Sequence, residues 1–242
     1  MSSSVLIFGA SGYIGLGVAL AMRRAGYQVY GMIRNEKHCA TLIQHEIEPI
    51  VASSFDDVQP VANILASCSI IIDAVGFNPK LSPILLEAAL HAGHDRTENG
   101  KLVHYAPLFI FTSGIMTFIQ GRRDMRWSWV HIDDLAEGYV AVIRAPRSVV
   151  DGQLYNIAAP NDNPTYEELR TAMAKAQGRK EKIEYKEADG NVPSRWDTDS
   201  IINPAKAMNE LGWRPRHVGF VEEIDTYYKA WAAHKAAHNA AK

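Results

Sequence analysis

Hydrophobic positions in the first half of the chain follow two alternating patterns. Short apolar runs predict strands, and segments with apolar residues at helical spacing predict helices between them. In chain order these are a strand near 4–9, a helix near 13–25, a strand near 28–33, a helix near 36–45, a strand near 47–52 and a helix near 57–66. This βαβα order is typical of a parallel sheet with helices on its faces.

Two further apolar runs extend the pattern. Residues 69–76 predict a fourth strand that is buried on both sides, and residues 108–113 predict a fifth. Between them, Ser82 is expected to cap a helix with Pro83 at its first position. Gly93 is expected to end that helix in a left-handed conformation.

The second half of the chain is dominated by helical patterns. Thr165-Tyr-Glu-Glu168 is a capping-box sequence, which predicts the start of a helix that stops at Gly178. Asn203-Pro204 begins another helix, which ends at Leu211-Gly212, and a last helix begins near Phe220. No internal repeat or long linker interrupts these elements.

Together these elements predict an α/β fold, a Rossmann-like doubly wound parallel sheet of five or six strands. The sixth strand would lie at residues 126–132. A smaller, mainly helical C-terminal lobe follows. We expect a dinucleotide-binding domain at residues 1–118 and a substrate-side lobe at residues 119–242.

The first strand runs into three glycines, which predict a nucleotide-binding turn. Gly9 permits the tight turn, Gly12 lets the backbone approach a pyrophosphate, and Gly15 lets the helix pack closely on the strand. The phosphates would sit on the unpaired amides at the helix N-terminus. The other residues of this turn that we expect to contact the cofactor are Ser11, Tyr13 and Ile14.

Arg34 follows the second strand, about 20 residues beyond the glycine turn. An acidic residue at this place would bind a ribose hydroxyl, whereas an arginine would receive a 2′-phosphate. Arg34 therefore favours NADP(H), while the nearby Glu36 keeps NAD(H) as the alternative.

These residues carry a resemblance that covers nearly the whole chain. The chain resembles the extended and atypical short-chain dehydrogenase/reductase superfamily, especially its nucleotide-sugar epimerase/dehydratase-like members. The match rests on the glycine turn, on strands ending Asp73-Ala-Val-Gly76 and Phe111-Thr-Ser113, on Trp129-Val-His-Ile-Asp-Asp-Leu-Ala136, and on residues 202–206 through 211–215.

The resemblance implies further site residues. Ala74, Val75 and Gly76 would contact the cofactor, and Asp56 would meet the adenine. Ser113 would hydrogen-bond the substrate oxygen as a catalytic residue, with Thr112 and Thr117 as alternatives. Asp133 and Asp134 could touch substrate, although two carboxylates at a helix start are more simply a cap.

The family's chemistry depends on a tyrosine with a lysine four residues later, which lowers the pKa of the phenol. None of the ten tyrosines has that lysine. Only seventeen residues separate Ser113 from His131, whereas a helical crossover with its strands needs roughly 30. We therefore expect the catalytic helix to be absent, and Tyr105 or His131 would have to supply the acid.

Two functions remain open on these grounds. One is an NADP(H)-dependent oxidoreductase or epimerase/dehydratase-like protein that acts on a small carbonyl or hydroxyl substrate. The other is a non-catalytic NADP(H)-binding sensor or scaffold, as in atypical members that resemble the regulator NmrA. Whether the chain is an enzyme is left open by the missing Tyr/Lys pair.

Composition narrows the setting. With 25 basic and 27 acidic side chains, the net charge of −2 offers no field for nucleic acid or an anionic membrane. The two cysteines have no metal or disulfide spacing, which favours a reducing, cytoplasmic setting. His91, His94 and His104 lack ligand spacing, so no metal site is expected, although His234 and His238 lie one helical turn apart. We expect a monomer or homodimer.

Overall fold

The structure is a computed structural model that describes residues 3–76, 78, 80–98, 106–114, 123–180, 183 and 199–240. The chain divides into two compact units. The first, called the sheet unit here, comprises Met1–Gly114, Leu135–Leu154 and Glu210–Trp213. The second, called the helical unit, comprises Ile115–Asp134, Tyr155–Asn209 and Arg214–Lys242. The predicted domain boundary at residue 118 stays a prediction.

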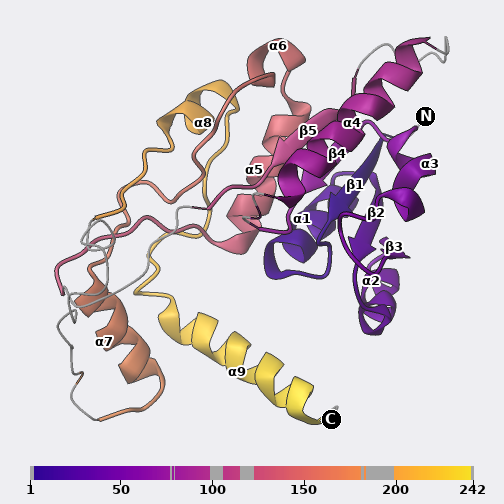
Figure 1. Cartoon of the computed structure of the whole chain (residues 1–242). Coiled ribbons are helices and arrows are strands. Elements are labelled where there is room, and N and C mark those ends of the chain that lie inside the picture. Colours follow the sequence, from indigo (N-terminus) through magenta and orange to yellow (C-terminus); the bar gives the residue numbers. More distant parts are fainter. Residues whose placement is uncertain are drawn as a thin grey trace. The chain divides into compact units, whose positions relative to one another are not determined.

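The sheet unit contains five parallel strands in the order β3-β2-β1-β4-β5 (Figure 1). This order confirms the predicted α/β, Rossmann-like fold. The chain reverses its direction of winding between β1 and β4, which places a topological switch point there. The strands are β1 (Ser4–Phe8), β2 (Gln28–Ile33), β3 (Glu48–Val51), β4 (Ile70–Asp73) and β5 (Leu108–Phe111).

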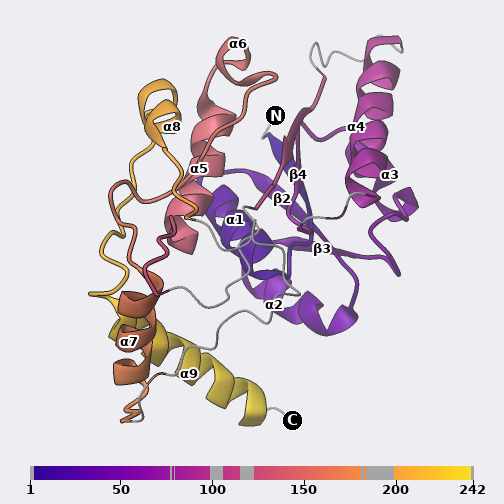
Figure 2. The ribbon, with the colours of Figure 1, turned by 60° about the vertical axis from the view of Figure 1, so that its left-hand side comes forward.

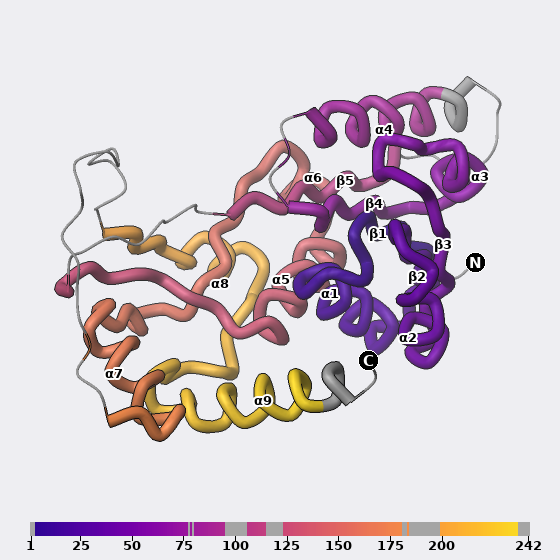
Figure 3. The backbone as a smooth tube through the Cα atoms, turned by 60° about the horizontal axis from the view of Figure 1, so that its bottom comes forward, coloured from indigo at the N-terminus to yellow at the C-terminus, as the bar shows by residue number. Residues whose placement is uncertain are grey.

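Helices cover both faces of this sheet. Figure 3 shows α3 and α4 on one side of the strands and α1 and α2 on the other. The helical elements of this unit are α1 (Tyr13–Arg24), η1 (Glu36–His38), α2 (Cys39–Gln44), η2 (Gln59–Val61), α3 (Ala62–Leu65), α4 (Leu81–Glu98), most of α5 (Ile132–Arg144) and α6 (Arg147–Val150).

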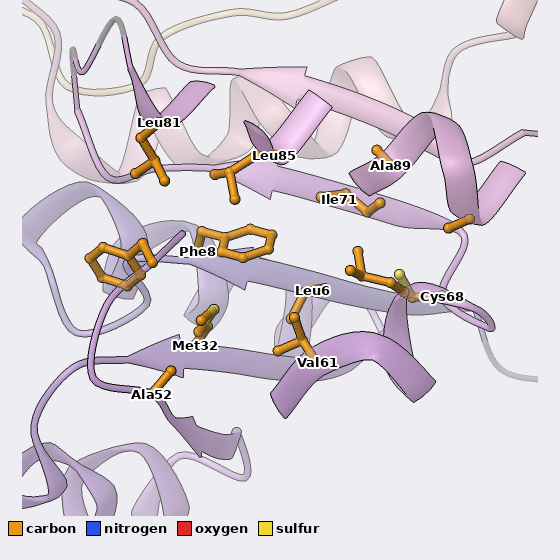
Figure 4. Close-up of a cluster of buried hydrophobic side chains, with 13 residues drawn as sticks. Leu6, Phe8, Met32, Ala52, Val61, Cys68, Ile71, Leu81, Leu85 and Ala89 are labelled. Atoms are coloured by element: carbon orange, nitrogen blue, oxygen red, sulfur yellow. The ribbon is translucent and has the colours of Figure 1, made fainter. Parts of the chain in front are cut away.

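The core on the α3 and α4 face follows from strand alternation. Leu6 and Phe8 of β1 point to the same face because side chains alternate along a strand. They pack with Met32 and Ile71 of the neighbouring strands and with Leu85 of α4 (Figure 4). Every one of these side chains is fully buried, so the sheet that carries the turn is a rigid platform.

Helix α4 differs from the sequence expectation at both ends. Ser82 is not the cap, because the Asn78 side chain accepts hydrogen bonds from the amides of Lys80 and Leu81 at 3.1 and 3.2 Å. Gly93 does not end the helix, which continues to Glu98. A Cβ at Gly93 would lie 3.4 Å from Ala106 and Pro107, an ordinary van der Waals distance, so this position of α4 packs beside those residues without requiring glycine.

The helical unit contains α7 (Tyr166–Ala176), most of α8 (Ala205–Glu210) and α9 (Ile224–Ala240). Helices α7 and α9 lie side by side (Figure 2). The capping box of Thr165 and Glu168 is confirmed, and Gly178 follows α7 with φ +68°. Within the described segments, no helix is both long and apolar enough to cross a membrane. The predicted cytoplasmic setting stays a prediction.

The predicted sixth strand is wrong. Residues 126–132 make two isolated bridges, Arg126 with Thr165 and Trp127 with Ser200, and do not join the sheet. Their two tryptophans pack against aromatic rings within the helical unit. Trp129 contacts Phe220 with ring centroids 4.7 Å apart, and Trp127 contacts Tyr166 at 5.8 Å. The apolar pattern therefore reflects burial in another layer, which a strand pattern alone does not distinguish.

Candidate dinucleotide site

The turn after β1 is fixed by backbone hydrogen bonds. The amides of Gly9 and Ala10 donate to the carbonyl oxygen of Met32 at 3.1 and 3.3 Å. The amide of Gly12 donates to the carbonyl oxygen of Gly9 at 2.9 Å. Gly12 is the N-cap of α1 and supplies no side-chain hydrogen bond. The first amides of a helix have no partners within it, so α1 presents donors to an anion at this end.

Two of the three glycines are required by the geometry. Gly9 has φ +82°, and a side chain there would lie 3.0 Å from the carbonyl oxygen of Ala74. A side chain at Gly15 would lie 2.1 Å from the carbonyl oxygen of Gly9, which no neighbouring group could accommodate. Helix α1 therefore approaches the turn as closely as only glycine allows, and this keeps its N-terminus at the strand ends.

A hollow of about 500 Å³ opens beside this turn in the sheet unit. Its residues follow the carboxyl ends of β1, β2, β3 and β4, where parallel α/β sheets bind their ligands. They are Gly9, Ser11 and Gly12 after β1, Arg34, Asn35, Lys37 and His38 after β2, Ser53 and Phe55 after β3, and Ala74 and Val75 after β4.

The hollow has a basic corner at the end of β2, formed by Arg34, Lys37 and His38. The Arg34 guanidinium carbon lies 5.0 Å from the centroid of the Phe55 ring, a cation–π distance that orients its side chain. The Asn35 side chain accepts a hydrogen bond from the amide of Lys37 at 3.0 Å and fixes the start of η1. Two exposed cations at one corner can bind a phosphate group.

All of the predicted cofactor residues lie in the described part of the chain. Six of them line the hollow: Gly9, Ser11, Gly12, Arg34, Ala74 and Val75. Five do not: Tyr13, Ile14, Gly15, Asp56 and Gly76. Tyr13 is 79% exposed in the first turn of α1, and Asp56 is exposed directly after Phe55. The cofactor roles of all these residues remain predictions.

Sequence reasoning missed five lining residues, Asn35, Lys37, His38, Ser53 and Phe55. The basic run Arg34-Asn-Glu-Lys-His38 directly after β2 was an available signal for three of them. Ser53 and Phe55 follow β3, and only the adjacency of β3 and β2 in the sheet brings them to the hollow.

The strand ends of β4 and β5 carry polar groups that bond to one another. Asp73 is 1% exposed, and its carboxylate accepts from the Val75 amide and from the Ser82 hydroxyl, each at 3.1 Å. This carboxylate shapes the loop that brings Ala74 and Val75 to the hollow, a role that the sequence did not reveal.

Next to Asp73, the hydroxyls of Thr112 and Tyr139 form a hydrogen bond of 2.6 Å. Burial raises the pKa of the Tyr139 phenol, and the negative charge of Asp73 adds to this, while the bond to Thr112 opposes it. Thr112 is therefore occupied by a partner from α5. Ser113 is exposed, two residues beyond the end of β5.

Several residues that were predicted to act on the substrate cannot be located beside the hollow. Thr117 and Tyr105 lie outside the described residues, as do residues 115–122 of the segment predicted to lack the catalytic helix. His131 belongs to the helical unit. The absence of a Tyr-x-x-x-Lys sequence is a property of the amino-acid sequence itself.

The side chain of Asp134 was expected to cap its own helix, but it instead binds backbone amides of a segment that is distant in sequence. Its carboxylate is 2% exposed and accepts from the amides of Arg216 and His217 at 3.0 and 2.8 Å. The side chain of His131 instead accepts from the Asp133 amide at 3.2 Å at the start of α5. Asp134 thus joins two chain segments of the helical unit that are 82 residues apart.

The strand order and the glycine turn define a Rossmann-like protein. A sequence model described as the NAD dependent epimerase/dehydratase family matches residues 78–158, about a third of the chain. No curated protein sequence matches the chain.

Solved structures share the fold over nearly the whole chain. PbgP3 protein from Burkholderia pseudomallei aligns with a TM-score of 0.73 and 15% identity, over 98% of both chains. UDP-glucose 4-epimerase from Thermotoga maritima aligns at 0.70 and 14%, over 95% of this chain and 99% of that one. The UDP-glucose 4-epimerase from Thermus thermophilus aligns at 0.65 and 15%, over 92% and 96%.

Over residues 78–158 the chain is thus similar to the NAD dependent epimerase/dehydratase family, and the solved structures share its Rossmann-like fold. An NAD(P) cofactor is implied by this family.

Proposed function

We propose that this protein binds NADP(H) in the hollow of the sheet unit. The observation that carries the proposal is the basic corner of Arg34 and Lys37, which lies in the same hollow as the glycine turn. The α1 N-terminus, which lacks a side-chain cap at Gly12, supplies amides for the diphosphate. The two cations would pair with the 2′-phosphate that distinguishes NADP(H) from NAD(H).

The remaining lining residues fit the same ligand. Ala74 and Val75 line the hollow on the β4 side, where the resemblance expects contacts with the cofactor. The Phe55 ring, which the Arg34 guanidinium covers, offers an apolar wall near the predicted adenine contact of Asp56. Glu36 is exposed beside Arg34 but is not a lining residue, which favours NADP(H) over NAD(H).

For the reaction, we propose oxidoreductase or epimerase/dehydratase-like chemistry on a small carbonyl or hydroxyl substrate. Bound nicotinamide would supply hydride exchange with the substrate carbon. Ser113, exposed beyond β5, would hydrogen-bond the substrate oxygen. Similar folds occur in UDP-glucose 4-epimerases and in an isoflavone reductase, which are the precedents for these two kinds of chemistry.

A second function is favoured by one specific observation, the lack of a Tyr-x-x-x-Lys sequence. Without this pair the protein would hold NADP(H) as a sensor or scaffold and transfer no hydride. The two functions share the binding site and differ in turnover alone.

Titration calorimetry with NADPH and NADH tests the binding step, and we expect NADPH to bind more tightly. Failure of both to bind would refute the proposed site. A screen of aldehydes, ketones and sugar nucleotides, followed by the absorbance of reduced nicotinamide, tests turnover. We expect turnover that Ser113→Ala lowers without weakening NADPH binding, whereas tight binding without turnover in any substrate class would establish the sensor.

A further inference from the structure

Two imidazoles and a carboxylate come together in the helical unit, apart from the residues of the dinucleotide site. His131 precedes α5, Asp133 lies in its first turn, and His217 lies in the segment before α9. One potential ligand atom from each residue lies within 4.8 Å of the other two. The two histidine rings stack, with centroids 4.1 Å apart and planes inclined by 33°.

The contacts around this cluster hold its members in place. The buried Asp134 carboxylate accepts from the amides of Arg216 and His217, and this keeps His217 beside the start of α5. The Tyr227 ring of α9 lies 5.4 Å from the His131 ring. Asp133 is exposed while both histidines are half-buried, so an ion can reach the cluster from solvent.

We propose that His131, Asp133 and His217 form a binding site for a divalent transition-metal ion, with Zn²⁺ as the expected occupant. Two imidazole nitrogens and one carboxylate oxygen are donors that suit Zn²⁺ better than Mg²⁺ or Ca²⁺. Three protein ligands leave the fourth tetrahedral position to water. No nucleotide takes part in this site, so it is independent of the proposed cofactor binding.

The geometry needs only a small adjustment to bind the ion. Bonds of about 2.0–2.1 Å in a tetrahedral site place ligand atoms roughly 3.4 Å apart, so the three atoms must approach by about 1.4 Å at most. His131 Nδ1 already lies 3.8 Å from the nearer oxygen of Asp133. If this nitrogen binds the ion, it gives up a 3.2 Å contact with the Asp133 amide, at the weak end of the hydrogen-bond range.

Metal binding would join two segments distant in sequence. His131 and Asp133 open α5, whereas His217 belongs to the segment that Asp134 already holds. An ion that binds the folded arrangement more tightly than the unfolded chain stabilises the folded protein. We therefore expect Zn²⁺ to raise the melting temperature of the full chain as well as to bind it.

The test uses the full chain without a histidine tag, stripped with a chelator and titrated with Zn²⁺ against a chromophoric competitor. We expect one ion per chain, and the absorption of bound Co²⁺ to report tetrahedral coordination. Asp133→Asn and His217→Ala should each weaken Zn²⁺ binding by about tenfold or more, because each removes one of three ligands.

The matched control is the double variant His234→Ala with His238→Ala, which removes a histidine pair one helical turn apart near the C-terminus. We expect it to bind Zn²⁺ as the wild type does. Loss of binding in this control, or unchanged binding in Asp133→Asn, would overturn the proposal. Thermal melts in chelator show whether His217→Ala still folds, and the exposed Asp133→Asn decides the matter if it does not.

Discussion

At the carboxyl edge of the sheet, the polar groups that follow β1 and β2 differ in their contacts from those that follow β4 and β5. At the ends of β1 and β2, the α1 N-terminus has no side-chain cap, and Arg34 and Lys37 are exposed at the hollow. At the ends of β4 and β5, the Asp73 carboxylate and the Thr112 hydroxyl are bonded to other protein groups. We therefore propose that the first side receives the ligand, whereas these polar groups of the second side are bonded within the protein.

This difference has a consequence for function. The proposed cofactor binding would draw on the backbone amides and cations of the β1 and β2 side, which are groups that bind phosphate. Hydride chemistry would draw on the β4 and β5 side, where a substrate must compete with Tyr139 for Thr112 or use the exposed Ser113. We therefore expect cofactor binding to be the more robust property of this protein.

The largest effect on this comparison should come from Gly12→Asp. A carboxylate beside the α1 N-terminus repels the diphosphate, and we expect NADPH affinity to fall by about 100-fold or more. Gly12 has φ −75°, which any residue adopts, and aspartate is a favourable N-cap. Because its Cβ would lie 3.2 Å from the carbonyl oxygen of Gly9, we expect a small drop in melting temperature and a folded variant. Calorimetry and a thermal melt measure both quantities.

The control for this variant is Ser148→Asp, which adds the same charge at an exposed position of α6 that does not line the hollow. It should bind NADPH normally. Equal binding by Gly12→Asp and the wild type would place the cofactor elsewhere and remove the basis of the comparison.

A smaller and selective loss is expected for Arg34→Ala. Removing one charge-assisted contact to the 2′-phosphate should weaken NADPH binding by about tenfold, while NADH, which lacks that phosphate, should lose less than about twofold. Arg24→Ala changes an exposed arginine at the end of α1 and serves as the control. Equal losses for the two cofactors would show that Arg34 does not read the 2′-phosphate.

Tyr139→Phe tests whether the polar groups at the ends of β4 and β5 contribute to stability and not to cofactor binding. Loss of the hydrogen bond to Thr112 should cost about 1 kcal/mol of unfolding free energy and leave NADPH affinity unchanged. Urea unfolding and calorimetry provide the two measurements. If Tyr139→Phe kept full stability but weakened NADPH binding, this side of the sheet would serve the cofactor site and not the stability of the fold.

The same pair predicts a pH dependence. Because folding raises the pKa of Tyr139 above its ordinary value of 10.0, the folded protein favours the protonated phenol. Its contribution to stability is complete below pH 10 and is lost as the pH rises from there through the raised pKa. Above pH 10 the wild type should therefore lose stability faster than Tyr139→Phe, and parallel stability curves would contradict the burial of the phenol.

The sequence predicted the sheet unit well because its signals are local. Apolar runs gave the five strands, and the requirement for glycine at Gly9 and Gly15 follows from contacts within one strand–turn–helix unit. The failures come from tertiary contacts. Gly93 was expected to end a helix, although α4 continues through it to Glu98. The segment around Trp129 was predicted to be a strand, although its tryptophans pack in the helical unit.

The residues of the candidate sites also fall into those that local sequence predicts and those that only tertiary contacts bring together. Arg34 could be predicted from its spacing after the glycine turn, whereas Phe55 reaches the hollow only because β3 pairs with β2. His217 lies 86 positions after His131 in the sequence, and no local pattern joins them. The buried carboxylate of Asp134, which holds the His217 amide, is the contact that brings them together.

The smallest effect should come from Ser82→Ala. The side chain that it removes is hydrogen-bonded, through Asp73, to the loop that lines the hollow. The Ser82 hydroxyl donates to Asp73, and Asp73 in turn accepts from the amide of Val75. Loss of that hydroxyl should cost about 1 kcal/mol, of which the higher helix propensity of alanine restores roughly 0.5 kcal/mol. We expect a net loss of about 0.5 kcal/mol by urea unfolding.

Because Val75 lines the hollow, a loosened loop should also weaken NADPH binding by about twofold, which calorimetry can resolve. Ser67→Ala removes a comparable hydroxyl that bonds only the carbonyl oxygens of Asn63 and Ile64, and it should leave the affinity unchanged. If Ser82→Ala weakened binding no more than this control does, the β4 side would be energetically separate from the cofactor site. A reduction similar to that of Arg34→Ala would instead make Asp73 a principal support of the hollow.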